Sequence, residues 1–321
     1  MKWWWKTLIC ISFLNPFFFL SAATIDYSIY FPAVVQGQSG HDNSGNCKNA
    51  LVDQLTVYTN GYINGTKGLD LQFCSAQKDL SSTSCDSVSD ARRKCTISSN
   101  NSIGLNLGQI GFLKSPSNSP SITINSNDCP TGSYILNGSI TQFSSLTVNT
   151  TCNVILNAAA SDYRFDSITL YSNSVLTLPV GDIWIQTLNI DQGNIILSAN
   201  AGRRQVYVQS ALNINTTKGL NYNGSSTDLL LVAYNNVTFN TASENHLYLY
   251  SDTITTLNSG AVIYGRVTTN KLVLNQGTIN DAVVAKSAID HYEISYPSSQ
   301  ITCEPAEITI NACTNSDNSS C

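Results

Sequence analysis

The sequence predicts an all-β protein: a parallel β-helix (solenoid), preceded by a Cys-rich irregular β region and followed by the start of a C-terminal β module. Apolar residues recur with the period of two that marks strands, as in GAVIYGRVTTNKLVLNQGTINDAVVA at residues 260–285. A phrase of two such runs returns several times along the chain. Only 12% of the 321 residues are charged, which suits stacked coils because a ladder of equal charges would repel.

Residues 1–23 have the features of a signal peptide. Lys2 and Lys6 form a charged start, an apolar run covers 7–20, and small residues follow at 21–23. A membrane anchor is the alternative, but the run is short and contains Asn15-Pro16. No later stretch is long and apolar enough to span a bilayer. We therefore expect an exported protein without a transmembrane segment after signal removal.

Residues 24–140 are predicted to form the Cys-rich β region. Short alternating runs at 50–65 and 69–74 are separated by Ser, Asn and Pro, as in LKSPSNSPS at 113–121. The first coil of a solenoid exposes an open β edge, and such an edge invites aggregation unless it is covered. We expect this region to cap the first coil.

Cysteine usage agrees with export. The chain has ten Cys and three His but no C-x-x-C pair, so disulfides are favoured over a zinc site. Plausible local bridges join Cys74 to Cys85 and Cys303 to Cys313, although connectivity cannot be read from sequence. Without Cys10 of the leader the count is odd, which leaves one thiol over.

Residues 141–289 carry the repeat. Its copies include SLTVNTTCNVIL at 145–156 and SITLYSNSVLTL at 167–178. A period near 20 residues, with Asn, Ser and Gly breaks, is typical of one coil of a parallel β-helix. An antiparallel sandwich of short strands stays open as the alternative.

The first apolar positions of the copies are Leu146, Ile168, Leu188, Leu212, Val237, Ile254 and Leu272. The predicted corners are Asn194, Asn221, Asn223, Gly224, Asn258, Gly260, Asn275 and Gly277. In the segment 260–285, which we expect to form the last coils, the side chains expected to pack inside or between coils are Tyr264, Val267, Leu272, Leu274, Ile279, Val283 and Val284.

No catalytic, cofactor or metal site is predicted. Glycoside hydrolysis needs two carboxylates at a defined separation, but no Asp-Asp or Asp-x-Asp pair occurs in the repeat, and G-x-S-x-G is missing. We expect Arg203, Arg204 and Arg266 to be exposed and His246 to be solvated. Outward tyrosines offer stacking faces that suit sugars or proteins, but their interpretation as ordinary strand residues is favoured. They are Tyr207, Tyr222, Tyr234, Tyr248, Tyr250 and Tyr264.

The segment 290–321 leaves the repeat and contains three short alternating runs, YEI, ITC and ITINAC. With the preceding GAVIYGRV and KLVLNQGTINDAVVA, it resembles the MshQ-like proteins of the mannose-sensitive haemagglutinin (MSHA) type IV pilus biogenesis cluster of Gram-negative bacteria. The matching tail positions are His291, Tyr292, Ile294, Cys303, Pro305, Ile308, Thr309, Ile310, Ala312 and Cys313. MshQ-like proteins continue well beyond this motif, so the resemblance implies a truncated C-terminal module.

The resemblance implies an exported, non-enzymatic surface protein in MSHA-type pilus biogenesis or pilus-linked adhesion. Its partners would be pilus or other cell-surface proteins, and host or surface glycans. The alternative is a secreted carbohydrate-active β-helix enzyme, a polysaccharide lyase or hydrolase. A formal net charge of -5 disfavours nucleic acid as a partner, since phosphate binding needs a basic face.

Overall fold

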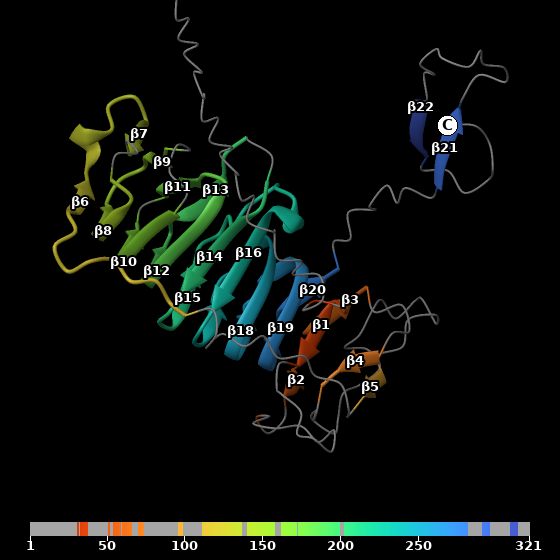
Figure 1. Ribbon diagram of the computed structural model, residues 1–321. Coiled ribbons are helices and arrows are strands. Elements are labelled where there is room, and N and C mark those ends of the chain that lie inside the picture. The colour runs from red at the N-terminus through yellow and green to blue at the C-terminus, as the bar shows by residue number, and fades with distance from the viewer. Residues whose placement is uncertain are drawn as a thin grey trace, which may run out of the picture.

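The computed structural model confirms a parallel β-solenoid of about eight turns (Figure 1). It describes residues 31, 33–37, 51, 54–58, 60–65, 70–73, 96–98, 111–136, 140–157, 162–171, 173–199, 202–281, 291–295 and 309–313. Every strand pair of the solenoid is parallel, and equivalent residues of successive coils stand opposite one another. The antiparallel sandwich is therefore excluded. Among the described residues, no helix is long and apolar enough to cross a membrane.

Each coil has three faces, which the chain visits in a fixed order. The first face is built by β14 (Arg204–Val208), β16 (Leu229–Ala233) and β1 (Val35–Gly37), together with the first parts of β10 (Asp162–Leu170) and β12 (Gly181–Asp191). The ends of β10 and β12 turn onto the second face, beside β6 (Ser121–Ile124), β8 (Gln142–Val148), β15 (Leu212–Asn215), β17 (Val237–Phe239) and β2 (Leu55–Val57).

The third face contains a separate four-stranded sheet of β7 (Ser133–Leu136), β9 (Asn153–Leu156), β11 (Val175–Leu178) and β13 (Asn194–Leu197). It resumes further along with β20 (Thr278–Asn280) and β3 (Tyr62–Asn64). Two long strands, β18 (Glu244–Asn258) and β19 (Val262–Asn275), run around all three faces.

Inward side chains of the second face form two continuous ladders. The first runs through Ile122, Leu146, Ile168, Leu188, Leu212, Val237, Thr255, Leu272 and Leu55. The predicted position Ile254 is wrong by one residue: the register shifts between Ser251 and Ile254, and Thr255 takes the inward place. Its hydroxyl donates to Thr269 Oγ1 at 3.2 Å, which satisfies a polar group in an otherwise apolar ladder.

The segment 260–285, which forms the last coils of the repeat, packs largely as expected. Val267, Leu272, Leu274 and Ile279 are fully buried, whereas Tyr264 points outward and is half-buried. Val283 and Val284 lie outside the described residues. Inward positions are thus set by strand alternation, as the sequence pattern requires.

Corners are made by left-handed residues followed by glycine. Gln192 and Gln276 both have φ 65°. A Cβ on the next residue, Gly277, would lie 2.2 Å from Leu257 Cβ of the preceding coil. Of the predicted corners, Asn221, Asn223 and Gly260 have positive φ. Asn194, Asn258 and Asn275 instead lie within strands.

An asparagine ladder braces the same corner. The Nδ2 group of Asn240 donates to Asn215 Oδ1 at 2.9 Å, Asn258 donates to Asn240 at 3.2 Å, and Asn275 donates to Asn258 at 3.3 Å. The two middle amides, Asn240 and Asn258, each donate one of these bonds and accept another, so the corner is held by a chain of side-chain hydrogen bonds.

The N-terminal strands up to residue 98 stack on the last coil, so for this part of residues 24–140 the expectation of a cap on the first coil is wrong. Strands β1, β2 and β3 pair with β19 and β20, while β4 (Asp70–Gln72) and β5 (Thr96–Ser98) extend the first face. Leu55 and Ile63 are fully buried, because they continue the inward ladders of the repeat. The burial of these apolar side chains provides the physical reason for docking there.

The chain must then return to the other end of the stack before β6 begins the first coil. Part of this return, residues 111–120, lies outside the first face. The Phe112 ring meets Trp184 edge-on at 5.7 Å and Tyr234 at 5.8 Å. With Phe31 near Tyr248 at 5.1 Å, it covers a second hydrophobic cluster on the outside of this face.

The described stack starts with β6 and β7, which pair with β8 and β9, so it includes part of the predicted Cys-rich region. A disulfide joins Cys129 to Cys152 of the next coil. This bridge was not predicted, although its separation of 23 residues is close to one repeat. Three predicted disulfide cysteines, Cys74, Cys85 and Cys303, lie outside the described residues. Cys313 ends strand β22 (Thr309–Cys313).

The predicted C-terminal module contains an antiparallel pair. Strand β21 (His291–Ser295) pairs with β22 (Thr309–Cys313), which matches the runs YEI and ITINAC. The run ITC lies outside the described residues.

Candidate functional site

A break in the third face creates the candidate site. Strand β13 ends the four-stranded sheet, and the next coil contributes only an isolated bridge between Ile195 and Leu220. The chain then turns through 221–225 and a 3-10 helix, η3 (Ser226–Asp228). Because a strand is missing from this rung, the surface is hollowed between neighbouring coils.

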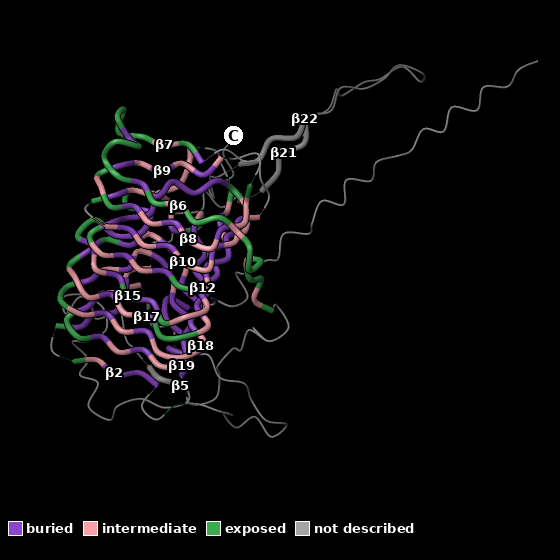
Figure 2. Tube along the Cα trace, turned by 90° about the vertical axis from the view of Figure 1, so that its left-hand side faces the viewer, coloured by how far each residue is buried: buried purple, intermediate pink, exposed green. Residues whose placement is uncertain are grey.

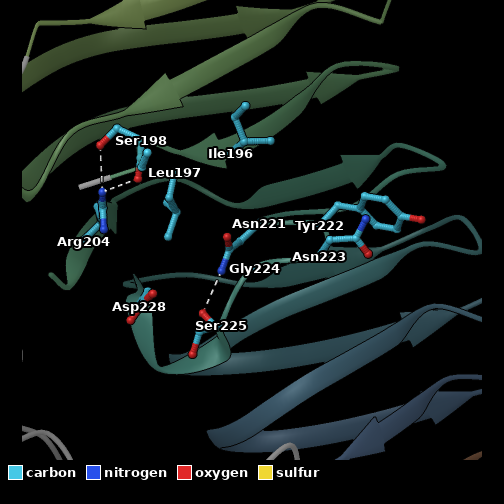
Figure 3. Close-up of a pocket in the computed structure, with 11 residues that line it drawn as sticks. Ile196, Leu197, Ser198, Arg204, Asn221, Tyr222, Asn223, Gly224, Ser225 and Asp228 are labelled. Atoms are coloured by element: carbon cyan, nitrogen blue, oxygen red, sulfur yellow. Dashed lines mark hydrogen bonds between the residues drawn. The ribbon is translucent and has the colours of Figure 1, made fainter. Parts of the chain in front are cut away.

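The hollow is a cavity of about 530 Å³. Figure 3 shows Arg204, Ser198 and Asp228 at one end and Tyr222 and Asn223 at the other. Ile196 and Leu197 supply apolar wall between these ends. A concave surface with an apolar wall and a few polar groups has the usual composition of a small-molecule site.

Arg204 is the charged residue set deepest in this wall. Its side chain is only 1% exposed, which contradicts the expectation of an exposed arginine. Nη2 donates to the Ser198 carbonyl at 2.8 Å and to Ser198 Oγ at 2.7 Å, and Nη1 donates to the Gly202 carbonyl. Burial lowers the pKa of Arg204, while the nearby Asp228 charge opposes that shift. The guanidinium is therefore a buried structural cation in the wall of the cavity.

The opposite wall is a rigid turn. Asn221 adopts a left-handed backbone, with φ 52°, and its Nδ2 group donates at 2.9 Å to both the Ser225 and His246 carbonyls. A side chain at Gly224 would collide with the Asn221 amide, whose Oδ1 atom lies 1.9 Å from the ideal Cβ position. Tyr222 projects from this turn and is 43% exposed. The turn thus offers one aromatic ring on a fixed base.

His246 lies next to this turn and is not solvated as expected. Its ring stacks on Tyr264 with centroids 4.7 Å apart. Burial lowers the pKa of His246, whereas Glu244 and a hydrogen bond with the Gly224 backbone oppose the shift. The neutral His246 ring, packed between the strands and the turn, therefore has a structural role.

The structure also brings together two carboxylates that no local motif reveals. Asp162 and Asp182 stand opposite each other on β10 and β12. Burial, followed by the charge of Asp162, raises the pKa of Asp182 to about 6. A signal was present in the sequence: the ladder positions Ile168 and Leu188 are 20 residues apart, and so are the two aspartates. Neither aspartate lines the cavity described above.

The predicted outward tyrosines do not form one exposed ladder. Tyr207 and Tyr250 are 3% and 1% exposed, because the outer side of the first face is covered. Tyr234 and Tyr248 pack against the same cluster. Of the six, Tyr222 alone ranks among the exposed large hydrophobic residues of the described chain.

Arg266 also departs from expectation. Its Nε and Nη2 atoms contact the two carboxylate oxygens of Asp281 at 3.0 and 3.2 Å, and Nη1 donates to the Phe31 carbonyl at 2.6 Å. The bidentate pair with Asp281 holds the guanidinium within the last coil, and the hydrogen bond to the Phe31 carbonyl ties that coil to the N-terminal segment. Within the described ranges, no group of three or more His, Cys, Asp or Glu residues could hold a metal ion.

Comparison with known proteins gives one match. Residues 289–321 match a domain of unknown function, DUF8613. No curated protein and no solved structure matches the chain. The matched segment coincides with the tail that leaves the repeat.

Proposed function

We propose that the protein is an exported, non-enzymatic surface protein of MSHA-type pilus biogenesis or pilus-linked adhesion, and that it binds glycans in the cavity beside Tyr222. The cavity is the observation that carries the binding role. The resemblance of the tail and repeat to MshQ-like proteins supports the pilus context.

The lining suits a neutral sugar. The ring of Tyr222 can stack on the apolar side of a pyranose, while Asn223 and Ser225 offer donors and acceptors to hydroxyls. Arg204 and Asp228 carry opposite charges, so the charged end of the cavity does not select a strongly anionic or cationic ligand. Ile196 and Leu197 add contact area.

A purified-protein experiment tests the binding role. Wild-type protein is applied to a glycan array beside Tyr222→Ala, with Tyr58→Ala as the control. Tyr58 is 52% exposed but does not line the cavity. We expect Tyr222→Ala to lose glycan binding and Tyr58→Ala to keep it. Equal binding by both variants, or no glycan bound by the wild type, would contradict a sugar site here.

A deletion strain tests the cellular role. Surface pili are counted by electron microscopy, and adherence and erythrocyte agglutination are scored in the same cultures. Loss of pili would assign the protein to assembly, and loss of adherence with normal pili would assign it to adhesion. No change in either would refute the pilus proposal.

The Asp162 and Asp182 pair favours a second candidate function, a carbohydrate-active enzyme. Adjacent strands lie about 4.8 Å apart, and an acid with a raised pKa beside a second carboxylate is the arrangement used by glycosidases. Release of reducing ends from polysaccharides by the wild type, abolished in Asp182→Asn, would establish this function. Absence of turnover across neutral and acidic substrates would exclude it.

A further inference from the structure

The outer side of the second face carries a regular array of small polar side chains. Seven consecutive rungs place one such residue at the same register position. We call these residues the hydroxyl face: Thr123, Thr147, Thr169, Asn189, Asn213, Thr238 and Thr256. None of them is buried. Figure 2 shows the rungs of β8, β10, β12, β15 and β17 lying one above another.

The array has two columns over its first four rungs. Ser121, Ser145, Ser167 and Thr187 stand in register two residues before the hydroxyl face. Rungs are spaced by about 4.8 Å and alternate residues of a strand by about 6.7 Å, so the oxygens occupy a nearly rectangular grid. From Thr123 to Thr256 the grid spans about 29 Å.

The side chains of the hydroxyl face are not used for hydrogen bonds within the described part of the protein. Over the described residues, no side chain among the seven hydrogen-bonds to another protein group. The second column differs, because Ser167 Oγ donates to the Ser144 carbonyl at 3.4 Å and the hydroxyls of Thr187 and Ser210 lie 3.3 Å apart. The hydroxyl face therefore directs its donors and acceptors to what lies outside.

The array is also stiff. Threonine is β-branched and has few χ1 rotamers, and each strand is paired on both sides or at the start of the stack. The corner that follows the face is braced by the asparagine ladder from Asn215 to Asn275. Donors that are already ordered lose little entropy when they bind an ordered partner.

The chemistry of the hydroxyl face limits the kinds of partner that it can bind. Its seven side chains carry no charge, which disfavours an ionic partner. No aromatic ring stands in the ladder for sugars to stack on. A protein partner would have to dehydrate seven polar groups, and such a loss is unfavourable unless every group is paired.

We propose that the hydroxyl face binds ice. Water held by regularly spaced hydroxyls keeps its hydrogen bonds, and the rung spacing is comparable with the distance between second-neighbour oxygens in ice. A layer ordered in this way can join a growing crystal without being displaced from the protein. The proposal does not depend on the cavity beside Tyr222 or on the pilus context.

Partition into ice tests the proposal. The full chain is mixed into buffer from which ice is slowly grown on a cold surface, and protein is measured in the ice and in the remaining liquid. Thermal hysteresis and crystal shape are recorded on the same samples. We expect wild-type protein to be enriched in the ice and to shape the crystals.

The substitutions Thr169→Lys and Thr238→Lys each place a long, charged side chain in the array. Both are expected to abolish enrichment of the protein in the ice. The matched control is Thr278→Lys, on the third face, which is expected to behave as the wild type. Melting curves confirm that each variant is folded, and the two separate test positions guard against misfolding of one. Exclusion of wild-type protein from ice would overturn the proposal, as would unchanged enrichment in both test variants. Binding to crystalline chitin or cellulose without binding to ice would also overturn it, in favour of a polysaccharide surface.

Discussion

Replacing Asp182 by Asn should stabilise the protein at neutral pH and leave its stability unchanged in acid. In the folded chain the Asp182 carboxyl has a pKa of about 6, against 3.8 as its ordinary value. Well below pH 3.8 the group is protonated in both folded and unfolded chains, so it contributes no difference. As the pH rises from about 4 to about 6, the unfolded chain releases the proton while the folded chain retains it, so the folded chain is progressively destabilised, and above about pH 6 the full destabilisation is present.

The full shift corresponds to about 3 kcal/mol at 1.36 kcal/mol per pKa unit. Asp182 is half-buried, and solvent screens such a group, so we expect a gain of about 1 to 2 kcal/mol. The free energy of unfolding is measured by urea denaturation at pH 4 and pH 7.5 for wild type, Asp182→Asn and Asp166→Asn. The control changes the net charge equally from strand β10. The reasoning is refuted if Asp182→Asn brings no gain at pH 7.5, or if the same gain persists at pH 4, which would indicate packing rather than charge.

Three further perturbations test the packing of the stack. Reduction of the disulfide, or the double substitution Cys129→Ser and Cys152→Ser, should destabilise the first coils by about 3 kcal/mol, as expected for a closed loop of this length. Amide hydrogen exchange should become faster in these coils only, and unchanged exchange would contradict the prediction. Gly277→Ala should cost about 1 to 3 kcal/mol, because the new methyl group meets Leu257 Cβ at 2.2 Å; an unchanged urea midpoint would show that the corner can relax. Phe112→Ala should cost about 2 kcal/mol and expose residues 111–120 to proteolysis, since a half-buried aromatic anchor is removed; unchanged cleavage would mean that other contacts hold the segment.

The solenoid could be predicted because its determinants are local and repeated. Each coil needs alternating apolar residues to fill the interior and left-handed or small residues to turn. Equivalent apolar positions such as Leu146, Ile168 and Leu188 therefore recur once per coil, and this recurrence identifies the fold. The predicted inward position Ile254 is wrong by one residue, because the register shift between the paired strands at this point cannot be seen in the sequence of either strand alone.

Other features depend on which coils become neighbours in space. The N-terminal strands could have stacked on either end of the solenoid, and only the fit of Leu55 and Ile63 to the last ladders selects one. Alternation alone also cannot tell whether an outward tyrosine is covered, and the return of Phe112 along the first face buries the cluster that contains Tyr207.

The sequence by itself determined the β-solenoid, its period and most of its inward side chains, because strand alternation and corner residues act within a single coil. Tertiary structure alone decided the cavity beside Tyr222, the burial of Arg204, the pairing of Asp162 with Asp182 and the disulfide between Cys129 and Cys152. All of these require two coils to be superimposed in one register. The physical reason is that stacking adds a direction along which residues about 20 positions apart become nearest neighbours.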